Sequence, residues 1–383
     1  MAANGEFRPG LDGVVATRSK ISYVDGKVGV LEYCGIKIAD LVEHSTFEET
    51  VYLLLHSHLP SKRELSKFST FFAGQRALPD SVLKAIKGFP VGMHPMVALQ
   101  AGITMLMGDD FYCDDLTSAR HNLQRCISLI AKVPTIVAAF DRHRNSEEPM
   151  PPISRFSHAA NFLFMLTGEA PDEEAAKIFD KLLIMHAEHT LNASTFTCRV
   201  IASTNSPLYS SVSGAVGALF GPLHGGANER VIRMLYSIGH PDNVEKFVEE
   251  MLATKGKIMG IGHRIYKVKD PRAIILQKAL PRLIEKLGGE EVADLYRIAV
   301  RLEEVCKKKL ADKALYPNVD FYSGIVLEIL GVPTDLFTTV FGIARTAGWC
   351  AHWLEQISAN RIFRPSQEYI GDHNRPYRPL ESR

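Results

Sequence analysis

The sequence lacks the features that mark several classes of protein. Its net charge is +1 over 383 residues, so no overall field attracts nucleic acid or an anionic membrane. Its six cysteines form no CxxC pair, which is typical of reduced thiols in a cytosolic protein. The N-terminus has neither the apolar core of a signal peptide nor an Arg- and Ser-rich presequence. We therefore expect a cytoplasmic protein.

Long apolar runs are also scarce, and the longest, from Leu336 to Trp353, is a poor membrane span. Arg345 and His352 interrupt it, and basic flanks are missing. Charge at the centre of a span is costly, so we expect a buried helix here. A buried Arg345 needs a carboxylate, and no acid lies within one helical turn of it. Its partner is either a distant Asp or Glu or the carboxylate of a bound ligand.

What remains is a mostly helical chain with minor N-terminal β segments. Apolar residues spaced by three and four predict the helices. Ser45 with Glu48 and Ser61 with Glu64 match the capping box at a helix start, and Asp172 opens a further helical pattern. Besides the helices that begin there, we expect helices near 94–107, 117–131, 208–220, 227–238, 243–253, 272–286, 291–309, 321–330 and 334–357. Strands are expected near Gly13–Thr17, Lys20–Tyr23 and Val28–Ile36.

Two glycine-flanked histidines are the first candidates for chemistry. His224 lies in GPLHGGAN at 221–228, directly before a helix whose free amides favour developing negative charge. His263 lies in a loop with glycines at 256, 260 and 262, where basic side chains suit a polyphosphate ligand. The alternatives are a histidine that caps a turn and a solvated basic loop. Either histidine could serve as a proton donor at a reacting oxygen.

Asp320 is the candidate base, although its position before an apolar helix is also that of an ordinary N-cap. Two imidazoles and one carboxylate together indicate acid–base chemistry on a carbon centre. His186 and His189 have a spacing that could hold a metal, but no further ligand stands near them. We expect no metal site.

Six motifs in order resemble the citrate synthases, over nearly the full chain from Gly10 onward. They are HAEHTLNASTF at 186–196, GPLHGGAN at 221–228, IMGIGHRIYKVKDPR at 258–272, PNVDFYSG at 317–324, FGIARTAGW at 341–349 and the Arg364-Pro365 tail. The related 2-methylcitrate synthases share nearly all of them. Each motif is moderately specific, and their order and spacing make the resemblance strong.

The resemblance implies a multi-helical, all-α homodimer whose domains close over the substrates. The large domain would comprise 1–225 and 331–383, and the smaller, inserted domain 226–330. The family condenses acetyl-CoA with oxaloacetate through an enol(ate) and hydrolyses citryl-CoA to citrate and CoA, a tricarboxylic acid cycle reaction. No tightly bound cofactor is implied, because acetyl-CoA is a cosubstrate.

Residue roles follow from the same resemblance. Asp320 would take the methyl proton, His224 would stabilise the enol(ate), and His263 would act as acid toward the oxaloacetate carbonyl. The oxaloacetate or citrate ligands would be His189, Arg272, Arg345 and Arg364, the last reaching the partner subunit's site. The CoA contacts would be Lys257, Ile258, Met259, Gly260, Ile261, Gly262, Lys267, Lys313 and Asn318.

Departures from the family pattern are small. Cys34 stands where many members carry arginine or tyrosine, which leaves a local role open. The N-terminal extension of the hexameric, NADH-regulated members is missing, so we expect a dimer without that control. Three alternatives remain: a 2-methylcitrate synthase using propionyl-CoA, a non-catalytic helical dimer of the same fold, and a metal-dependent hydrolase using His186 and His189.

Overall fold

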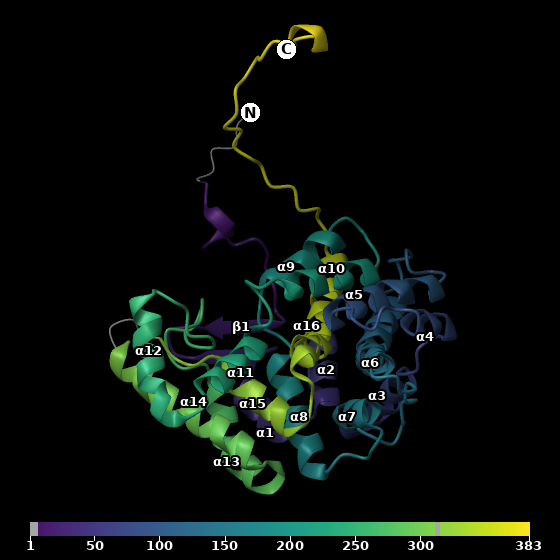
Figure 1. Ribbon diagram of the computed structural model, residues 1–383. Coiled ribbons are helices and arrows are strands. Elements are labelled where there is room, and N and C mark those ends of the chain that lie inside the picture. The colour runs from purple at the N-terminus through teal and green to yellow at the C-terminus, as the bar shows by residue number, and fades with distance from the viewer. Residues whose placement is uncertain (1–6, 311–314) are drawn as a thin grey trace.

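The computed structural model describes residues 7–310 and 315–383, and within them the fold is all-α, as predicted (Figure 1). The helices are α1 (Ile38–His44), α2 (Phe47–His56), α3 (Lys62–Gly74), α4 (Asp80–Ile86), α5 (Pro95–Leu106), α6 (Ala119–Arg144), α7 (His158–Thr167), α8 (Glu173–His186), α9 (Ala193–Ala202), α10 (Leu208–Phe220), α11 (Ala227–Ile238), α12 (Val244–Ala253), α13 (Pro271–Leu287), α14 (Glu290–Lys309), α15 (Val319–Ile329) and α16 (Phe337–Ser358). For the helices that were predicted, most bounds lie within two residues of the expected ones, whereas α1, α4, α7 and α9 were not predicted.

The small sheet is an antiparallel meander of β1 (Ser22–Asp25), β2 (Val30–Tyr33) and β3 (Ile36–Lys37). Tyr33 is fully buried, and its hydroxyl donates to the Glu188 carbonyl over 2.9 Å, which ties the sheet to the chain after α8. The strand expected near Gly13–Thr17 was wrong. Gly13 lies in a turn, the residues after it have no regular secondary structure, and the segment pairs with no strand in the described part of the chain.

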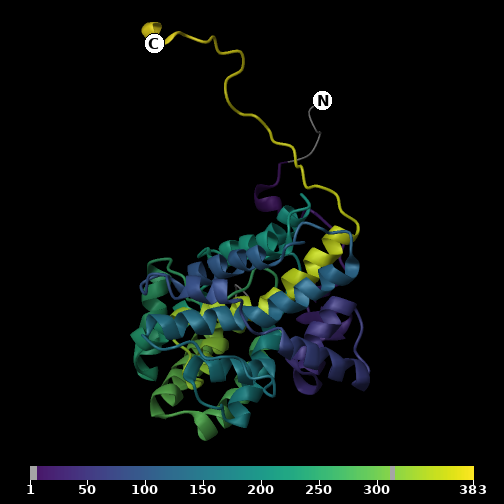
Figure 2. The same cartoon turned by 90° about the vertical axis from the view of Figure 1, so that its right-hand side faces the viewer.

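Helix α16 is the central element, as expected for the stretch that includes Leu336 to Trp353. It packs against α2, α5, α6, α8, α9, α10 and α11, and Trp349 and Trp353 are fully buried. Figures 1 and 2 show it running through the body beneath the surrounding helices. Arg345 therefore lies in the protein core and not in a membrane.

Helix α6 extends well past the predicted end at residue 131. It continues through Pro134 to Arg144, because both sides of the proline are buried against neighbouring helices and tertiary packing outweighs the lost hydrogen bond. By length and composition α6 could cross a membrane. However, 78% of its most apolar window is buried inside the protein, which is typical of a core helix.

The helix starts test the capping predictions. The capping box at Ser61 is present: the Glu64 N–H donates to Ser61 Oγ over 3.4 Å, and the Glu64 carboxylate accepts the Ser61 N–H over 2.8 Å. The Asp172 cap of α8 is also present. The box predicted at Ser45 was wrong, because Thr46 caps α2 and Glu48 accepts the His158 N–H at the start of α7 over 2.6 Å. A buried partner from another helix displaced the local cap.

Helices α11 to α15 form a group to one side of α16. Helix α15 packs on α11, α13 and α14, and α12 packs on α14 (Figure 1). At the opposite end, the chain leaves the body after α16. The Phe363 N–H donates to Ser203 Oγ over 3.1 Å, and beyond it the tail runs outward to Arg383 (Figure 2).

Candidate active site

His224 lies in the loop between α10 and α11, and this loop is held tightly. The Arg230 guanidinium donates to the carbonyls of Pro222, Gly225 and Gly226 over 2.8, 2.9 and 3.0 Å. Gly226 has a φ of 70°, which favours glycine. The arginine and the glycine together fix the turn from which the imidazole projects.

The hydrogen bonds of His224 define its tautomer. Its Nε2 accepts the Ser194 N–H over 3.2 Å and lies 2.8 Å from Ser194 Oγ, which in turn accepts from the Trp349 indole over 3.1 Å. A backbone amide can only donate, so the ring proton is on Nδ1. Burial and the charge of Arg345 lower the pKa of His224 to about 4. His224 is therefore a neutral donor.

His263 has the opposite tautomer. Its Nδ1 accepts the N–H groups of Ile265 and Tyr266 over 3.0 and 3.2 Å, so Nε2 carries the proton. Burial, followed by the charge of Arg272, lowers the pKa of His263 to about 4. The ring centroid lies 5.4 Å from that of His189. The structure thus brings together two of the predicted substrate-contacting histidines.

The start of α15 is joined to the glycine-rich loop by backbone pairing. Ile261 forms a bridge with Pro317, Gly262 donates to the Tyr316 carbonyl over 2.8 Å, and the Asn318 N–H donates to the Gly260 carbonyl over 2.9 Å. The Asn318 side chain also donates to the Gly262 carbonyl over 2.9 Å. No periodic pattern predicts this contact, which places the loop beside Asp320.

Asp320 is not the N-cap of α15. Asn318 is the cap, because its side chain accepts the Asp320 N–H over 3.0 Å, and Asp320 occupies the second helical position. In the described part of the chain no group donates to the Asp320 carboxylate. Burial raises its pKa to about 6, although Arg272 and Arg345 oppose this rise. The carboxylate is thus free to accept a proton.

Arg272 and Arg345 are both buried, but their surroundings differ. Arg272 makes a two-pronged ion pair with Asp270, over 3.0 and 2.8 Å, and Asp270 also accepts the Val319 N–H at the start of α15. Arg345 donates through Nε to the His186 carbonyl over 2.8 Å and lies 4.7 Å from the Phe341 ring centroid. Its Nη1 and Nη2 have no partner among the described residues.

Tyr266 was missed by the sequence analysis. Its hydroxyl lies 3.2 Å from His189 Nε2, its ring centroid lies 4.7 Å from that of His263, and its side chain is buried. Ser194, Trp349 and Asp270 were also missed as supports of His224 and Arg272. All four stand inside or beside the motifs, but no spacing rule shows which of their neighbours they contact.

The other predicted CoA contacts lie around the same loop. Lys257 is exposed, Ile258, Met259, Ile261 and Gly262 are partly buried, and Gly260 is buried. The Lys267 N–H donates to the Gly26 carbonyl over 2.8 Å, so the turn of the β1–β2 hairpin covers this loop. Lys267 itself has an exposed side chain. Lys313 lies outside the described residues.

Arg364 and the metal alternative stand apart from this cluster. Arg364 lies on the exposed tail, and its Nη1 donates to the Pro365 carbonyl over 2.8 Å. His186 uses Nδ1 on the Leu182 carbonyl over 2.8 Å, and burial lowers its pKa to about 3. Across residues 7–310 and 315–383, no group of three or more His, Cys, Asp or Glu side chains is arranged to hold a metal.

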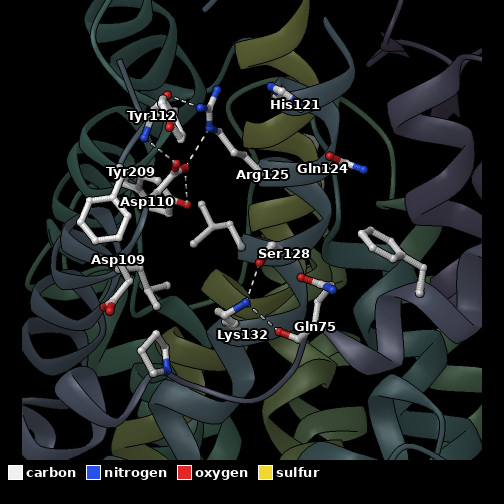
Figure 3. Close-up of a pocket in the computed structure, with 15 residues that line it drawn as sticks. Gln75, Asp109, Asp110, Tyr112, His121, Gln124, Arg125, Ser128, Lys132 and Tyr209 are labelled. Carbon is white, nitrogen blue, oxygen red and sulfur yellow. Dashed lines mark hydrogen bonds and ion pairs between the residues drawn. The ribbon is translucent and has the colours of Figure 1, made fainter. Parts of the chain in front are cut away.

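A separate cavity of about 710 Å³ lies between α3, α5, α6 and α10 (Figure 3). There the Asp110 carboxylate accepts from Arg125 Nε and the Tyr209 hydroxyl over 2.8 and 3.1 Å. Lys132 donates to the Gln75 carbonyl over 2.9 Å. None of the predicted site residues lines this cavity, so it is not part of the His224, His263 and Asp320 cluster.

Comparison with known proteins gives a consistent result. The family model "Citrate synthase, C-terminal domain" matches residues 10–366. A citrate synthase from Synechocystis sp. is 49% identical over 383 residues, covering 100% of this chain and 96% of that protein. A citrate/2-methylcitrate synthase from Bacillus subtilis is 39% identical over 372 residues, covering 97% and 98%.

A solved structure matches this chain in fold. It is the ternary complex of carboxymethyl coenzyme A and oxaloacetate with citrate synthase from Thermoplasma acidophilum. It has a TM-score of 0.92 and 31% identity to this chain, and the match covers 98% of this chain and 99% of that one.

Proposed function

This chain belongs to the citrate synthase family, and we propose that it condenses acetyl-CoA with oxaloacetate and hydrolyses the citryl-CoA to citrate and CoA. One observation carries the proposal: a proton acceptor, Asp320, and two neutral histidines surround the buried Arg272 and Arg345, whose charges act on them. Backbone amides fix the donor nitrogens of both histidines. A thioester α-proton is weakly acidic, so a base and a donor must act together.

In the first step Asp320 takes a proton from the methyl carbon of acetyl-CoA, while Nδ1–H of His224 donates to the thioester oxygen. The low pKa of His224, about 4, keeps the ring neutral at physiological pH. A neutral imidazole is a suitable partner for an enol(ate), because it donates a hydrogen bond without competing with Asp320 for the proton. Asp320 holds the proton that it has gained.

In the second step the enol(ate) carbon attacks the ketone carbon of oxaloacetate. A C–C bond forms, and the ketone oxygen takes the proton of His263 Nε2–H. Water then attacks the thioester carbonyl, and one of its protons leaves with CoA as the thiol. The proton of the new carboxyl group returns His263 to its neutral form, and Asp320 releases its proton to solvent. His189, Arg272 and Arg345 would hold the carboxylates, and a fixed positive charge would lower their desolvation cost.

The cosubstrate and assembly follow from the same family membership. The loop containing Lys257 to Gly262, with Lys267, Lys313 and Asn318, would bind CoA. Residues 226–330 would form the domain that closes onto residues 1–225 and 331–383, which excludes water from the enol(ate). We further propose a cytoplasmic homodimer in which Arg364 of the partner subunit completes each site.

A 2-methylcitrate synthase is the second candidate, because a relative that is 39% identical carries both activities in its name. The substrates differ by one methylene, which a pocket distinguishes by only about 1–3 kcal/mol. Citrate formation is favoured, since the more similar relative is a citrate synthase alone.

The test is thiol release by the purified chain with oxaloacetate fixed. We expect turnover with acetyl-CoA and a higher kcat/KM for it than for propionyl-CoA. The opposite preference would establish the second candidate. Correctly folded protein that releases no thiol from either acyl-CoA would overturn both, and a thermal shift with oxaloacetate would then separate a binding protein from an inert helical dimer.

A further inference from the structure

Arg345 is a buried cation whose charge has no contact partner. The side chain is 1% exposed, its only hydrogen bond to the described residues goes from Nε to the His186 carbonyl, and no carboxylate makes an ion pair with it. Burial lowers its pKa to about 10, and the largest opposing influence is the charge of Glu188. A buried charge without any compensation is strongly unfavourable.

Glu188 is a buried anion fixed in one position. It is 0% exposed, and its Oε1 accepts from Ser22 Oγ over 2.9 Å and from His352 Nε2 over 3.0 Å. Its Oε2 has no hydrogen-bond partner among the described residues. Burial disfavours the carboxylate, yet His352, followed by the charge of Arg345 and the hydrogen bond from Ser22, holds the pKa of Glu188 below its ordinary value.

The histidine beside Glu188 does not supply the missing positive charge. His352 Nδ1 lies 3.0 Å from Arg199 Nη1, and a guanidinium can only donate. Nδ1 is therefore an acceptor, and the single ring proton is on Nε2, directed at Glu188. A neutral His352 orients Glu188 but leaves its negative charge uncompensated. Arg199 is itself paired with Glu355 over 2.6 Å.

The neighbouring pair of Arg272 and Asp270 shows how a direct ion pair occupies the donors of a buried guanidinium. Asp270 accepts from both Nε and Nη2 of Arg272, and Nη1 of that guanidinium donates to the Met185 carbonyl over 3.4 Å. Arg345 keeps Nη1 and Nη2, the edge that matches a carboxylate in a two-pronged contact.

Glu188 lies two residues after His186, whose carbonyl accepts from Arg345. Its Oε2 lies against Gly348, about one turn of α16 beyond Arg345. Glu188 thus lies close enough to compensate the charge of Arg345 and uses none of its donors.

We propose that Glu188 is the permanent counter-charge of Arg345, a positioning residue that keeps the guanidinium ionised in the empty site and sets how tightly it binds a substrate carboxylate. The nature of that carboxylate, oxaloacetate, rests on the proposed function. Glu188 and the incoming carboxylate share one cation, so each weakens the hold of the other. The enzyme thereby limits its affinity for oxaloacetate, a dianion, at a site from which it must release citrate, a trianion.

The first test is the affinity of Glu188→Gln for oxaloacetate, measured by calorimetry without any acyl-CoA. Removal of the competing charge is expected to lower Kd by about tenfold, with the same change in KM. Glu355→Gln is the matched control, because Glu355 is also a carboxylate, on the same helix as Arg345, but is paired with Arg199. The Kd of this variant for oxaloacetate should stay at the wild-type value. Glu188→Asp keeps the negative charge and should have a Kd for oxaloacetate close to the wild-type value.

Unchanged or weaker binding by folded Glu188→Gln would overturn the proposal, since general structural damage also weakens binding. A second measurement needs neither activity nor ligand. Arg345→Met leaves Glu188 as an uncompensated buried anion, so the double variant Arg345→Met/Glu188→Gln should have a higher Tm than Arg345→Met alone. An equal or lower Tm would overturn the proposal, even if Glu188→Gln alone does not fold and even if the chain has no synthase activity.

Discussion

At the scale of single residues, burial decides the proton states of the candidate site. The same desolvation lowers the pKa of His224 and His263 to about 4 and raises that of Asp320 to about 6. Near neutral pH the histidines are therefore neutral donors and the aspartate is an ionised acceptor. Backbone amides on the opposite ring nitrogens then direct the two donors.

The Asp320→Asn variant is expected to have lower turnover and higher stability than the wild type. The pKa of Asp320 is about 6 in the folded protein against an ordinary value of 3.8, so the folded state is favoured below pH 4 and loses that advantage as pH rises through 6. Above pH 6 the variant should be more stable by roughly 1–3 kcal/mol, with turnover lower by about 100-fold or more.

Urea unfolding at pH 5 and pH 8 checks this stability change, and the gain should be larger at pH 8. Asp114→Asn, at an exposed carboxylate, is the control and should change stability by less than about 0.5 kcal/mol. An equal gain in the free energy of unfolding at both pH values would show that the charge of Asp320 does not destabilise the folded protein. Near-normal turnover would exclude it as the base.

At the scale of elements, α16 and the chain after α8 approach so closely that only glycine fits between them. The Gly348 N–H donates to the Ala187 carbonyl over 3.2 Å. A Cβ on Gly348 would lie 2.5 Å from the Ala187 carbonyl oxygen and would overlap Glu188 Oε2. Neither atom can retreat easily, because one is backbone and the other belongs to a carboxylate held by Ser22 and His352.

Gly348→Ala should destabilise the protein by about 2–4 kcal/mol in urea unfolding, although alanine is the better helix former. Gly74→Ala is the matched control, because a Cβ there meets nothing within 4 Å at the end of α3. That variant should be neutral or more stable by up to about 1 kcal/mol. Equal stabilities for the two variants would refute the close approach.

Local rules predicted the helices but not their contacts. The spacing of apolar residues and the Ser61 and Asp172 caps defined most elements, because these signals are local. The course of α6 through Pro134 and the use of Glu48 by α7 depend on burial by other helices. His224 and His263 were recognisable from their glycines, whereas Tyr266 and Glu188 acquire their importance only from packing.

At the scale of the whole molecule, the tail separates Arg364 from the cluster on its own chain. After Phe363 contacts Ser203, the described tail makes hydrogen bonds only within itself, and it runs away from the body (Figures 1 and 2). An extended segment of this kind suits an arm that lies on a second copy. Arg364 would then act in a site built by another chain.

Co-expression of Arg364→Ala and Asp320→Asn subunits tests this arrangement. Each variant alone should be nearly inactive. In a mixed dimer one of the two sites has an intact Asp320 and an intact Arg364 of the partner subunit. Random pairing makes about half of the dimers mixed, so roughly a quarter of wild-type activity should return. Variants that stay inactive when mixed, with exchange of subunits verified by mass, would place Arg364 in its own chain's site.

The contact between the hairpin turn and the His263 loop has a consequence for synthesis of the chain. Gly26 accepts the Lys267 N–H, so the hairpin leaves the ribosome about 240 residues before its partner exists. At ~5–20 residues per second, that is an interval of ~10–50 s. During it the β1–β2 hairpin lacks the loop that it covers in the folded protein, which makes this N-terminal segment a target for chaperones.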